Sequence, residues 1–185
     1  LGVTVFFLAR VQASLYFMNN IADETIFNRA RRQVLINAVP FVVLFLIFVG
    51  VTLTADGYEL NPVNGEVFVR KYKYFFNLIE MPWGAVMFLI GVVSVLYAII
   101  RAAFSKTWIC GIWYSGIGTV LVVLSLFFLA GYNNTPYYPS AVDLQSSLTI
   151  YNSSSSLFTL EVMTVVSFLV PFVLAYIVYA WRAMD

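Results

Sequence analysis

Arg10 is a charged side chain inside a stretch of apolar residues, where it could do chemistry. A charge within a membrane span is costly and usually faces the interior of a helix bundle or an aqueous cavity. One interpretation is therefore an ion or proton pathway, or a clamp on an anionic group. The other is a structural arginine that extends toward the membrane surface or pairs with a neighbouring subunit. The sequence leaves both interpretations open.

Glu161 is the second candidate, near the start of another apolar stretch. A carboxylate there is stabilised by the helix dipole and by the free N–H groups at a helix N-terminus. The alternative is a protonatable carboxylate near an outward proton exit. Because no acid, histidine or lysine partner lies nearby in the sequence, the structural interpretation is favoured.

The chain contains no histidine and one cysteine, Cys110. Such a chain cannot ligate haem, copper, zinc or an iron–sulfur cluster in the usual ways. A glycine-rich phosphate loop and a nucleophile–base pair are also missing from the sequence. We therefore expect no catalytic, cofactor-binding or metal-binding residue here, and any metals of a redox machine on a partner chain. Cys110 lies in an apolar band and is expected to be a small buried side chain.

Apolar residues make up 62% of the 185 residues and charged residues only 10%, against roughly 25% charged in a typical soluble domain. No basic tract could follow a phosphate backbone, so nucleic-acid binding is not expected. A spanning helix needs about 20 mostly apolar residues. Five bands approach that length, which predicts an all-α polytopic transmembrane helical bundle of about five spans. The bands are Leu1–Met18, Val34–Thr54, Met81–Phe104, Trp108–Gly131 and Leu157–Trp181.

The connections between the bands differ in charge. The positive-inside rule places the basic connections, and with them the C-terminus, in the cytoplasm. We expect residues 1–185 to form a single membrane-embedded helical domain. Because the chain starts inside an apolar stretch, we also expect it to be the C-terminal part of a longer subunit. The basic connections are Asn19–Gln33 with Arg29, Arg31 and Arg32, then Arg101–Lys106, and finally Arg182.

An aromatic group follows the charged segment Arg70–Lys73 and favours a short amphipathic helix on the membrane surface. The same group could instead dock a quinone head group or a partner loop. It consists of Tyr72, Tyr74, Phe75 and Phe76.

Small residues gather at the start of the fourth band, where Gly111, Ser115 and Gly118 lie near Gly116. Small residues let membrane helices approach closely, so we expect a packing face there. The polar run Asn152–Ser156 is expected to cap the fifth helix, because hydroxyl and amide side chains accept from free N–H groups at a helix start.

The segment Tyr138–Trp181 resembles the C-terminal part of subunit II of the cytochrome bd-type ubiquinol oxidases. Weaker upstream likenesses, at Arg29–Arg31, Asp56–Tyr58 and Pro82, follow in the same order, so the resemblance covers nearly the whole chain. The matching pieces of the C-terminal segment are Pro139–Ser140, Ser147–Thr149, Asn152–Ser155, Thr159–Leu160, Val162–Thr164, Pro171, Tyr176 and Trp181.

The resemblance implies a non-haem subunit of a respiratory quinol:dioxygen oxidoreductase in the bacterial inner membrane. It implies that haems b and d lie on a partner, subunit I, and that the complex helps to generate a proton-motive force. Quinol, membrane lipid and small single-span accessory subunits are further expected partners, with quinone or lipid at the periphery of this chain. The residues at which the family is thought to serve proton or oxygen access lie in the other half of subunit II, so none is carried over.

Two other functions remain as alternatives. Pro40 and Pro171 lie inside predicted spans, and broken helices often form substrate sites, which would suit half of a secondary transporter. However, the spans hold few charges and no inverted repeat is evident. A membrane scaffold or assembly protein is the remaining alternative.

Overall fold

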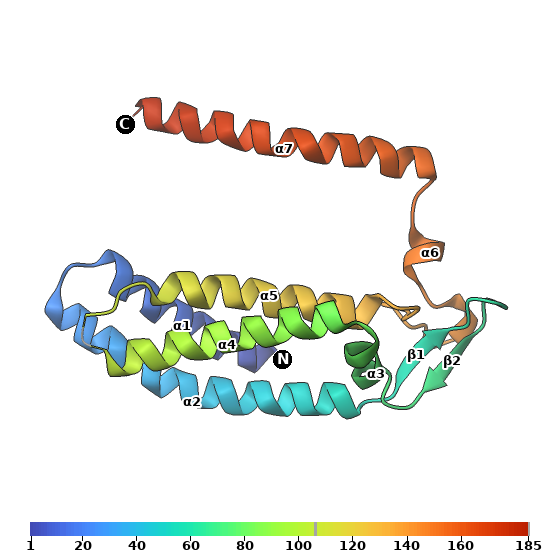
Figure 1. Cartoon of the computed structure of the whole chain (residues 1–185), viewed down its shortest axis with the longest axis horizontal. Helices are drawn as coiled ribbons and strands as arrows, with labels where there is room; N and C mark the ends of the chain where they lie inside the picture. Colours follow the sequence, from blue (N-terminus) through green and yellow to red (C-terminus); the bar gives the residue numbers. More distant parts are fainter. Residues whose placement is uncertain (106, 185) are drawn as a thin grey trace. The chain divides into compact units, whose positions relative to one another are not determined.

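A computed structural model describes residues 1–105 and 107–184 of the chain (Figure 1). It divides into two compact units, Leu1–Thr149 and Ile150–Asp185, and each is described by itself. The single domain expected over 1–185 therefore stays a prediction.

The first unit is built on four long helices: α1 (Gly2–Asn20), α2 (Glu24–Thr54), α4 (Pro82–Phe104) and α5 (Gly111–Gly131). Helix α1 packs against α2 and α5, and α4 packs against the same two helices, which closes a four-helix bundle (Figure 1). The second unit contains α6 (Ile150–Ser153) and α7 (Leu157–Met184).

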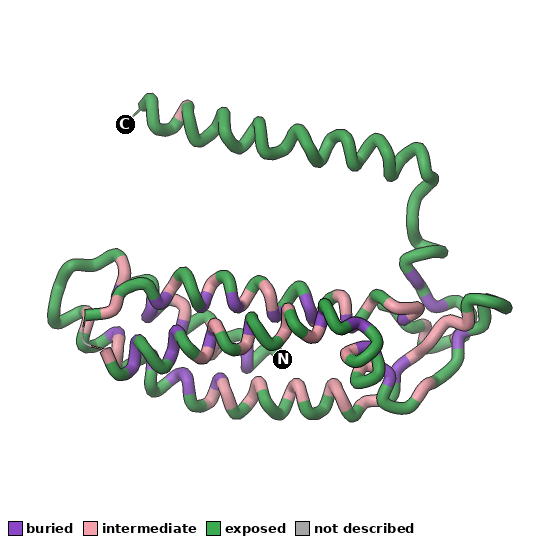
Figure 2. Tube along the Cα trace, viewed as in Figure 1, coloured by how far each residue is buried: buried purple, intermediate pink, exposed green. Residues whose placement is uncertain are grey.

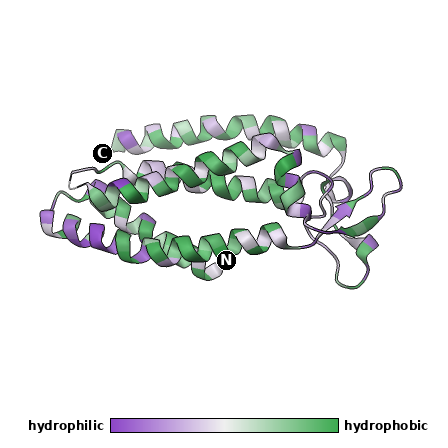
Figure 3. Ribbon diagram, turned by 60° about the horizontal axis from the view of Figure 1, so that its bottom comes forward, coloured by the Kyte–Doolittle hydropathy of each residue, from purple (hydrophilic) through white to green (hydrophobic). Residues whose placement is uncertain are grey.

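Four of these helices, α2, α4, α5 and α7, are long and apolar enough to cross a membrane. Figure 3 shows apolar residues along the helices and hydrophilic residues gathered toward the helix ends and connections. Together with the long helix α1, these helices confirm the predicted all-α polytopic architecture, with roughly four to five spans. The chain is an integral membrane protein.

Buried and exposed positions alternate along the helices of the first unit (Figure 2). Many of the exposed positions on the outward faces of these helices carry apolar side chains. A soluble bundle would place polar residues on those outward faces. The exposed apolar surface is therefore the surface that meets lipid or a partner. The core cluster comprises Val11, Leu15, Met18, Ala30, Val34, Ala38, Phe41, Val95, Ile99 and Ala102.

Helix α2 begins at Glu24, well before the predicted band at Val34. The carboxylate of Asp23 caps it by accepting from the Ile26 N–H at 2.8 Å. The predicted connection Asn19–Gln33 was therefore wrong for most of its length, because the apolar band marks the membrane part of a helix and not the whole helix. Of the other basic connection, Lys106 lies outside the described residues.

The connection between α2 and α4 contains an antiparallel hairpin, β1 (Gly57–Leu60) and β2 (Val67–Arg70), followed by the short helix α3 (Lys73–Glu80). The predicted amphipathic helix is confirmed as a helix, whereas the hairpin was missed. After α5, the chain returns to the hairpin edge through η1 (Leu144–Ser146). There the Gln145 side chain accepts from the Val67 N–H and donates to the Val67 carbonyl, as a further strand would.

No described residue of α7 is buried within its own unit (Figure 2). The Ser156 hydroxyl accepts from the Thr159 N–H at 3.4 Å, so the predicted cap of this helix is confirmed at Ser156.

Candidate functional site

A network of charged and amide side chains lies at the end of the bundle where α2, α4 and α5 meet the hairpin. The Lys73 ammonium group is completely buried; it pairs with the Glu59 carboxylate at 3.2 Å and donates to the Asn133 carbonyl at 3.1 Å. Arg70 pairs with Glu59 at 2.9 Å and with Glu80 at 3.3 Å. The two acids, from β1 and α3, thus neutralise the two bases, from β2 and α3.

Asn77 is the second fully buried polar residue of α3. Its amide N–H₂ donates to the Leu129 carbonyl at 3.0 Å and to the Thr135 hydroxyl at 2.8 Å, and its oxygen accepts from Asn133 at 3.1 Å. The last turn of an α-helix has free carbonyl groups that need partners. Asn77 supplies one for α5 and so ties α3 to the end of that helix.

The segment after α5 reaches the network through two residues in the left-handed region, Asn133 and Asn134, both with φ of 55°. Asparagine adopts this conformation more readily than most residues because its short side chain can bond locally. The turn directs the Asn133 carbonyl to Lys73 and the Asn134 carbonyl to the Leu60 N–H, at 2.7 Å. The sequence Asn-Asn therefore joins α5, α3 and β1.

The electrostatics of the site follow from these contacts. The hydrogen bond to Glu59 is the main cause that raises the pKa of Arg70 above its ordinary value. Burial raises the pKa of the Tyr74 phenol, and nearby Tyr58 adds to the effect.

The raised pKa of Tyr74 predicts that the folded protein loses stability at alkaline pH. Its raised pKa means that the folded chain holds the phenolic proton more tightly than the unfolded chain. This contribution to stability is complete below the unfolded pKa of about 10 and is lost as the pH rises above it. Thermal unfolding of the detergent-solubilised protein, from about pH 9 to about pH 11, should show a smaller loss for Tyr74→Phe than for the wild type. Equal losses would contradict the assignment.

The contacts of the network position the segments that carry its side chains. Its bases are paired with its acids, and within residues 1–105 and 107–184 no three His, Cys, Asp or Glu side chains gather where they could hold a metal ion. The arrangement holds the hairpin, α3 and the segment after α5 in one place over the bundle end.

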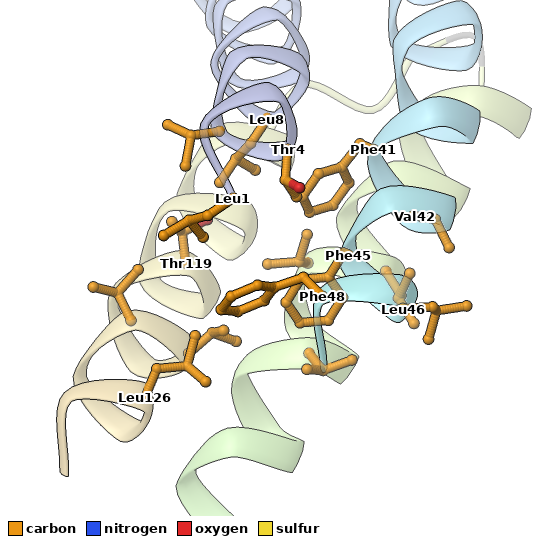
Figure 4. Close-up of a pocket in the computed structure, with 16 residues that line it drawn as sticks. Leu1, Thr4, Leu8, Phe41, Val42, Phe45, Leu46, Phe48, Thr119 and Leu126 are labelled. Carbon is orange, nitrogen blue, oxygen red and sulfur yellow. The ribbon is translucent and has the colours of Figure 1, made fainter. Parts of the chain in front are cut away.

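An apolar pocket of about 120 Å³, partly open to the surface of the bundle, lies between α1, α2, α4 and α5. Figure 4 shows Phe45 and Phe48 of α2 beside Thr119 and Leu126 of α5 on its walls. Thr119 accepts a hydrogen bond from the Gln12 side chain at 2.9 Å, so its hydroxyl is satisfied at the pocket wall.

The predicted small-residue face is where α5 meets its neighbours. Gly111, Ser115 and Gly118 are all buried, and a Cβ on Gly118 would lie 2.7 Å from the Gly91 carbonyl of α4. Gly116, in contrast, has no atom within 4 Å of its Cβ position, so it takes no part in this contact. Whether the face matters for assembly stays a prediction.

Arg10 lies on the outward side of α1, exposed, with its guanidinium carbon 5.7 Å from the centre of the Phe6 ring. The depth of Arg10 follows from its neighbour Gln12, which donates a hydrogen bond to Thr119 of α5. Thr119 lies eight residues after Gly111, the first residue of α5, which is roughly 12 Å along the helix at about 1.5 Å per residue. Arg10 is thus within the apolar part of the bundle but does not face its interior. This position favours the structural interpretation, and the role itself stays a prediction.

Glu161 lies in the second turn of α7 and is exposed within its own unit. Neither of its two predicted roles is tested by that position. Arg10 and Glu161 belong to different units. Cys110, expected to be buried, is exposed at the N-cap of α5. That prediction was wrong because the apolar band extends past the start of the helix.

The sequence profile of the family described as cytochrome bd terminal oxidase subunit II matches residues 1–184. The chain belongs to this family. The resemblance carried by Tyr138–Trp181 is confirmed. The α4–α5 contact and the polar network are thus features of a subunit II chain.

A relative from Haemophilus influenzae (strain ATCC 51907 / DSM 11121 / KW20 / Rd) is described as "Probable cytochrome oxidase subunit 2". It is 30% identical over 176 residues, which cover 87% of this chain and 44% of the relative. This subunit II chain therefore spans less than half the length of that relative.

The sequence did not reveal the central residues of the subunit II network, Glu59, Lys73, Asn77 and Asn133. One signal was available. Lys73, Asn77 and Glu80 recur at helical spacing, with Phe75 and Ile79 on the opposite side of the helix, which predicts a polar face with partners.

Proposed function

We propose that the chain is part of the non-haem subunit that supports the haem-bearing subunit I of a respiratory quinol:dioxygen oxidoreductase. The match of residues 1–184 to the subunit II family carries this proposal. The complex would couple quinol oxidation to reduction of dioxygen to water and help to generate a proton-motive force. The part of this chain is structural: its exposed apolar helix faces meet subunit I and keep water away from it.

Haems b and d belong to subunit I in this proposal, where they supply electron transfer and oxygen binding. The sequence of this chain does not offer histidine, the most usual axial ligand of haem. The sequence has no histidine, and the acidic residues Glu59 and Glu80 are engaged by Arg70. Quinone or lipid is proposed only at the periphery, and small single-span subunits are further candidate partners.

The proposed location is the bacterial cytoplasmic membrane, with the C-terminus in the cytoplasm. Basic residues support this orientation. Arg31 donates to the Ala103 carbonyl at the end of α4, and Arg101 lies in the last turn of the same helix. These residues mark one end of the bundle, opposite the hairpin, and the positive-inside rule assigns that end to the cytoplasm.

Purification of the full-length subunit with its native associates, in a mild detergent, tests the proposal. A dithionite-reduced minus air-oxidised spectrum should show haem bands, and a gel should show a second large hydrophobic subunit. A spectrally silent preparation of one component would contradict the proposal. Substrate-dependent flux in liposomes would then point to a transporter, and its absence to a scaffold.

A further inference from the structure

Helix α3 buries polar side chains and exposes apolar ones, the reverse of a surface helix in a water-soluble protein. Its polar residues Lys73 and Asn77 are 0% exposed, whereas Phe75 is 44% and Ile79 is 60% exposed. Tyr72, just before the helix, is also half exposed. Residues three and four positions apart share one helix face. Lys73 and Asn77 therefore lie on the face toward the bundle, and Phe75 and Ile79 lie on the opposite face.

The hydrogen bonds of the inward face prevent α3 from rotating. Turning Phe75 and Ile79 inward would take Lys73 away from Glu59 and Asn133, and Asn77 away from Leu129 and Thr135. Buried polar groups without partners are costly. The outward apolar face is thus a fixed surface of the folded chain.

The position of α3 along the bundle corresponds to the edge of a membrane. The helix contacts α2, α4 and α5, and α4 begins at Pro82, directly after it (Figure 1). Trp83 and Tyr132 are half exposed at the same bundle end and lie edge to face, with ring centres 6.0 Å apart. Tryptophan and tyrosine are enriched where hydrocarbon meets water.

The charge around α3 fits the same boundary. Arg70 covers the Phe76 ring, with the guanidinium carbon 4.6 Å from the ring centre, while its nitrogens pair with Glu59 and Glu80. Lys71 is exposed beside it. A charged rim next to an apolar face is typical of helices that lie in the membrane interface.

We propose that the outward face of α3, formed by Tyr72, Phe75 and Ile79, is inserted into the lipid surface at this end of the bundle. Lipid fits better than a protein partner because the face has a charged rim at Arg70 and Lys71 and lies at the same bundle end as the half-exposed pair Trp83 and Tyr132. Helix α3 thereby anchors the hairpin and the Glu59–Lys73 network at a defined height on the membrane. This inference does not depend on the oxidase function.

Spin labelling of the complex tests the insertion. In a Cys110→Ser background, single cysteines replace Phe75, Ile79 or the hairpin residue Val63, which is 93% exposed. Each nitroxide-labelled complex is reconstituted into vesicles of phosphatidylethanolamine and phosphatidylglycerol. Collisions with oxygen, which dissolves in lipid, are then compared with collisions with a water-soluble nickel chelate.

Lipid insertion predicts that the ratio of oxygen to nickel collisions at positions 75 and 79 exceeds that at 63 by a factor on the order of ten, because an interfacial helix buries its apolar face below the head groups. High nickel accessibility at 75 and 79 would overturn the proposal in favour of a water-facing helix. Low accessibility to both reagents, with an immobilised label, would overturn it in favour of a protein contact. Retained unfolding temperature shows that each labelled variant is folded, and the haem spectrum tests the oxidase proposal separately.

Discussion

A Gly118→Ala variant is expected to unfold more easily than the wild type, with a free energy of unfolding lower by about 2 kcal/mol, because overpacking of a close contact typically costs about 1–3 kcal/mol. The added Cβ would lie 2.7 Å from the Gly91 carbonyl oxygen and 2.9 Å from the Ser94 Cβ. A backbone oxygen cannot rotate away, so α4 and α5 must separate. Membrane helices associate mainly through packing, and separation removes it. Thermal or denaturant unfolding in detergent measures the effect.

Gly116→Ala is the matched control, because it makes the same change on the same helix. The Cβ position of Gly116 meets no atom within 4 Å, so no clash arises with the described residues of its own unit. Alanine favours a helix over glycine, and the control should be neutral or slightly stabilising. Equal losses for the two variants would show that the contact between Gly91 and Gly118 is not the cause.

Glu59→Gln should cost about 3 kcal/mol, because removing one partner of a buried ion pair leaves an uncompensated charge. The Lys73 side chain is 0% exposed and loses its only carboxylate in the described chain, whereas Arg70 keeps Glu80. The buried Lys73 is then left without a carboxylate partner. Unfolding experiments near neutral pH should show the loss.

The control for this prediction is Glu66→Gln on the same hairpin. Glu66 is exposed and bonds only to neighbouring Asn64 among the side chains whose contacts are described. Surface changes of this kind usually alter stability by less than about 0.5 kcal/mol. A double variant, Glu59→Gln with Lys73→Met, should recover part of the loss because it removes both charges. A loss as large for Glu66→Gln would contradict the special role of Glu59.

The long helices could be predicted because each corresponds to one continuous run of mostly apolar residues. The bands at Met81–Phe104 and Leu157–Trp181 match α4 and α7 closely. A membrane span is a local property of about 20 residues, and its composition alone identifies it. The N-terminal third of α2 escaped prediction because its residues are polar, although Asp23 is a recognisable cap.

The polar network could not be predicted because its contacts join distant parts of the chain. Asn77 bonds to Leu129 and Thr135, which lie 52 and 58 residues away. The spacing of small residues on α5 likewise indicated a packing face. It could not distinguish Gly118, which meets α4, from Gly116, which has no neighbour within the chain. The two glycines differ only in whether α4 packs against them, and the sequence does not give the placement of α4.

Because Asn77 and its hydrogen-bond partners lie far apart in the sequence, the contacts of the network must form in a fixed order during biosynthesis. When α3 leaves the ribosome, Lys73 can already reach Glu59, but Asn77 has none of its partners until residues 129–135 are made. At about 5–20 residues per second, 52 residues take roughly 3 to 10 seconds. During that interval α4 and α5 have yet to be completed. The arrival of the last turn of α5 is therefore the step that closes this end of the bundle.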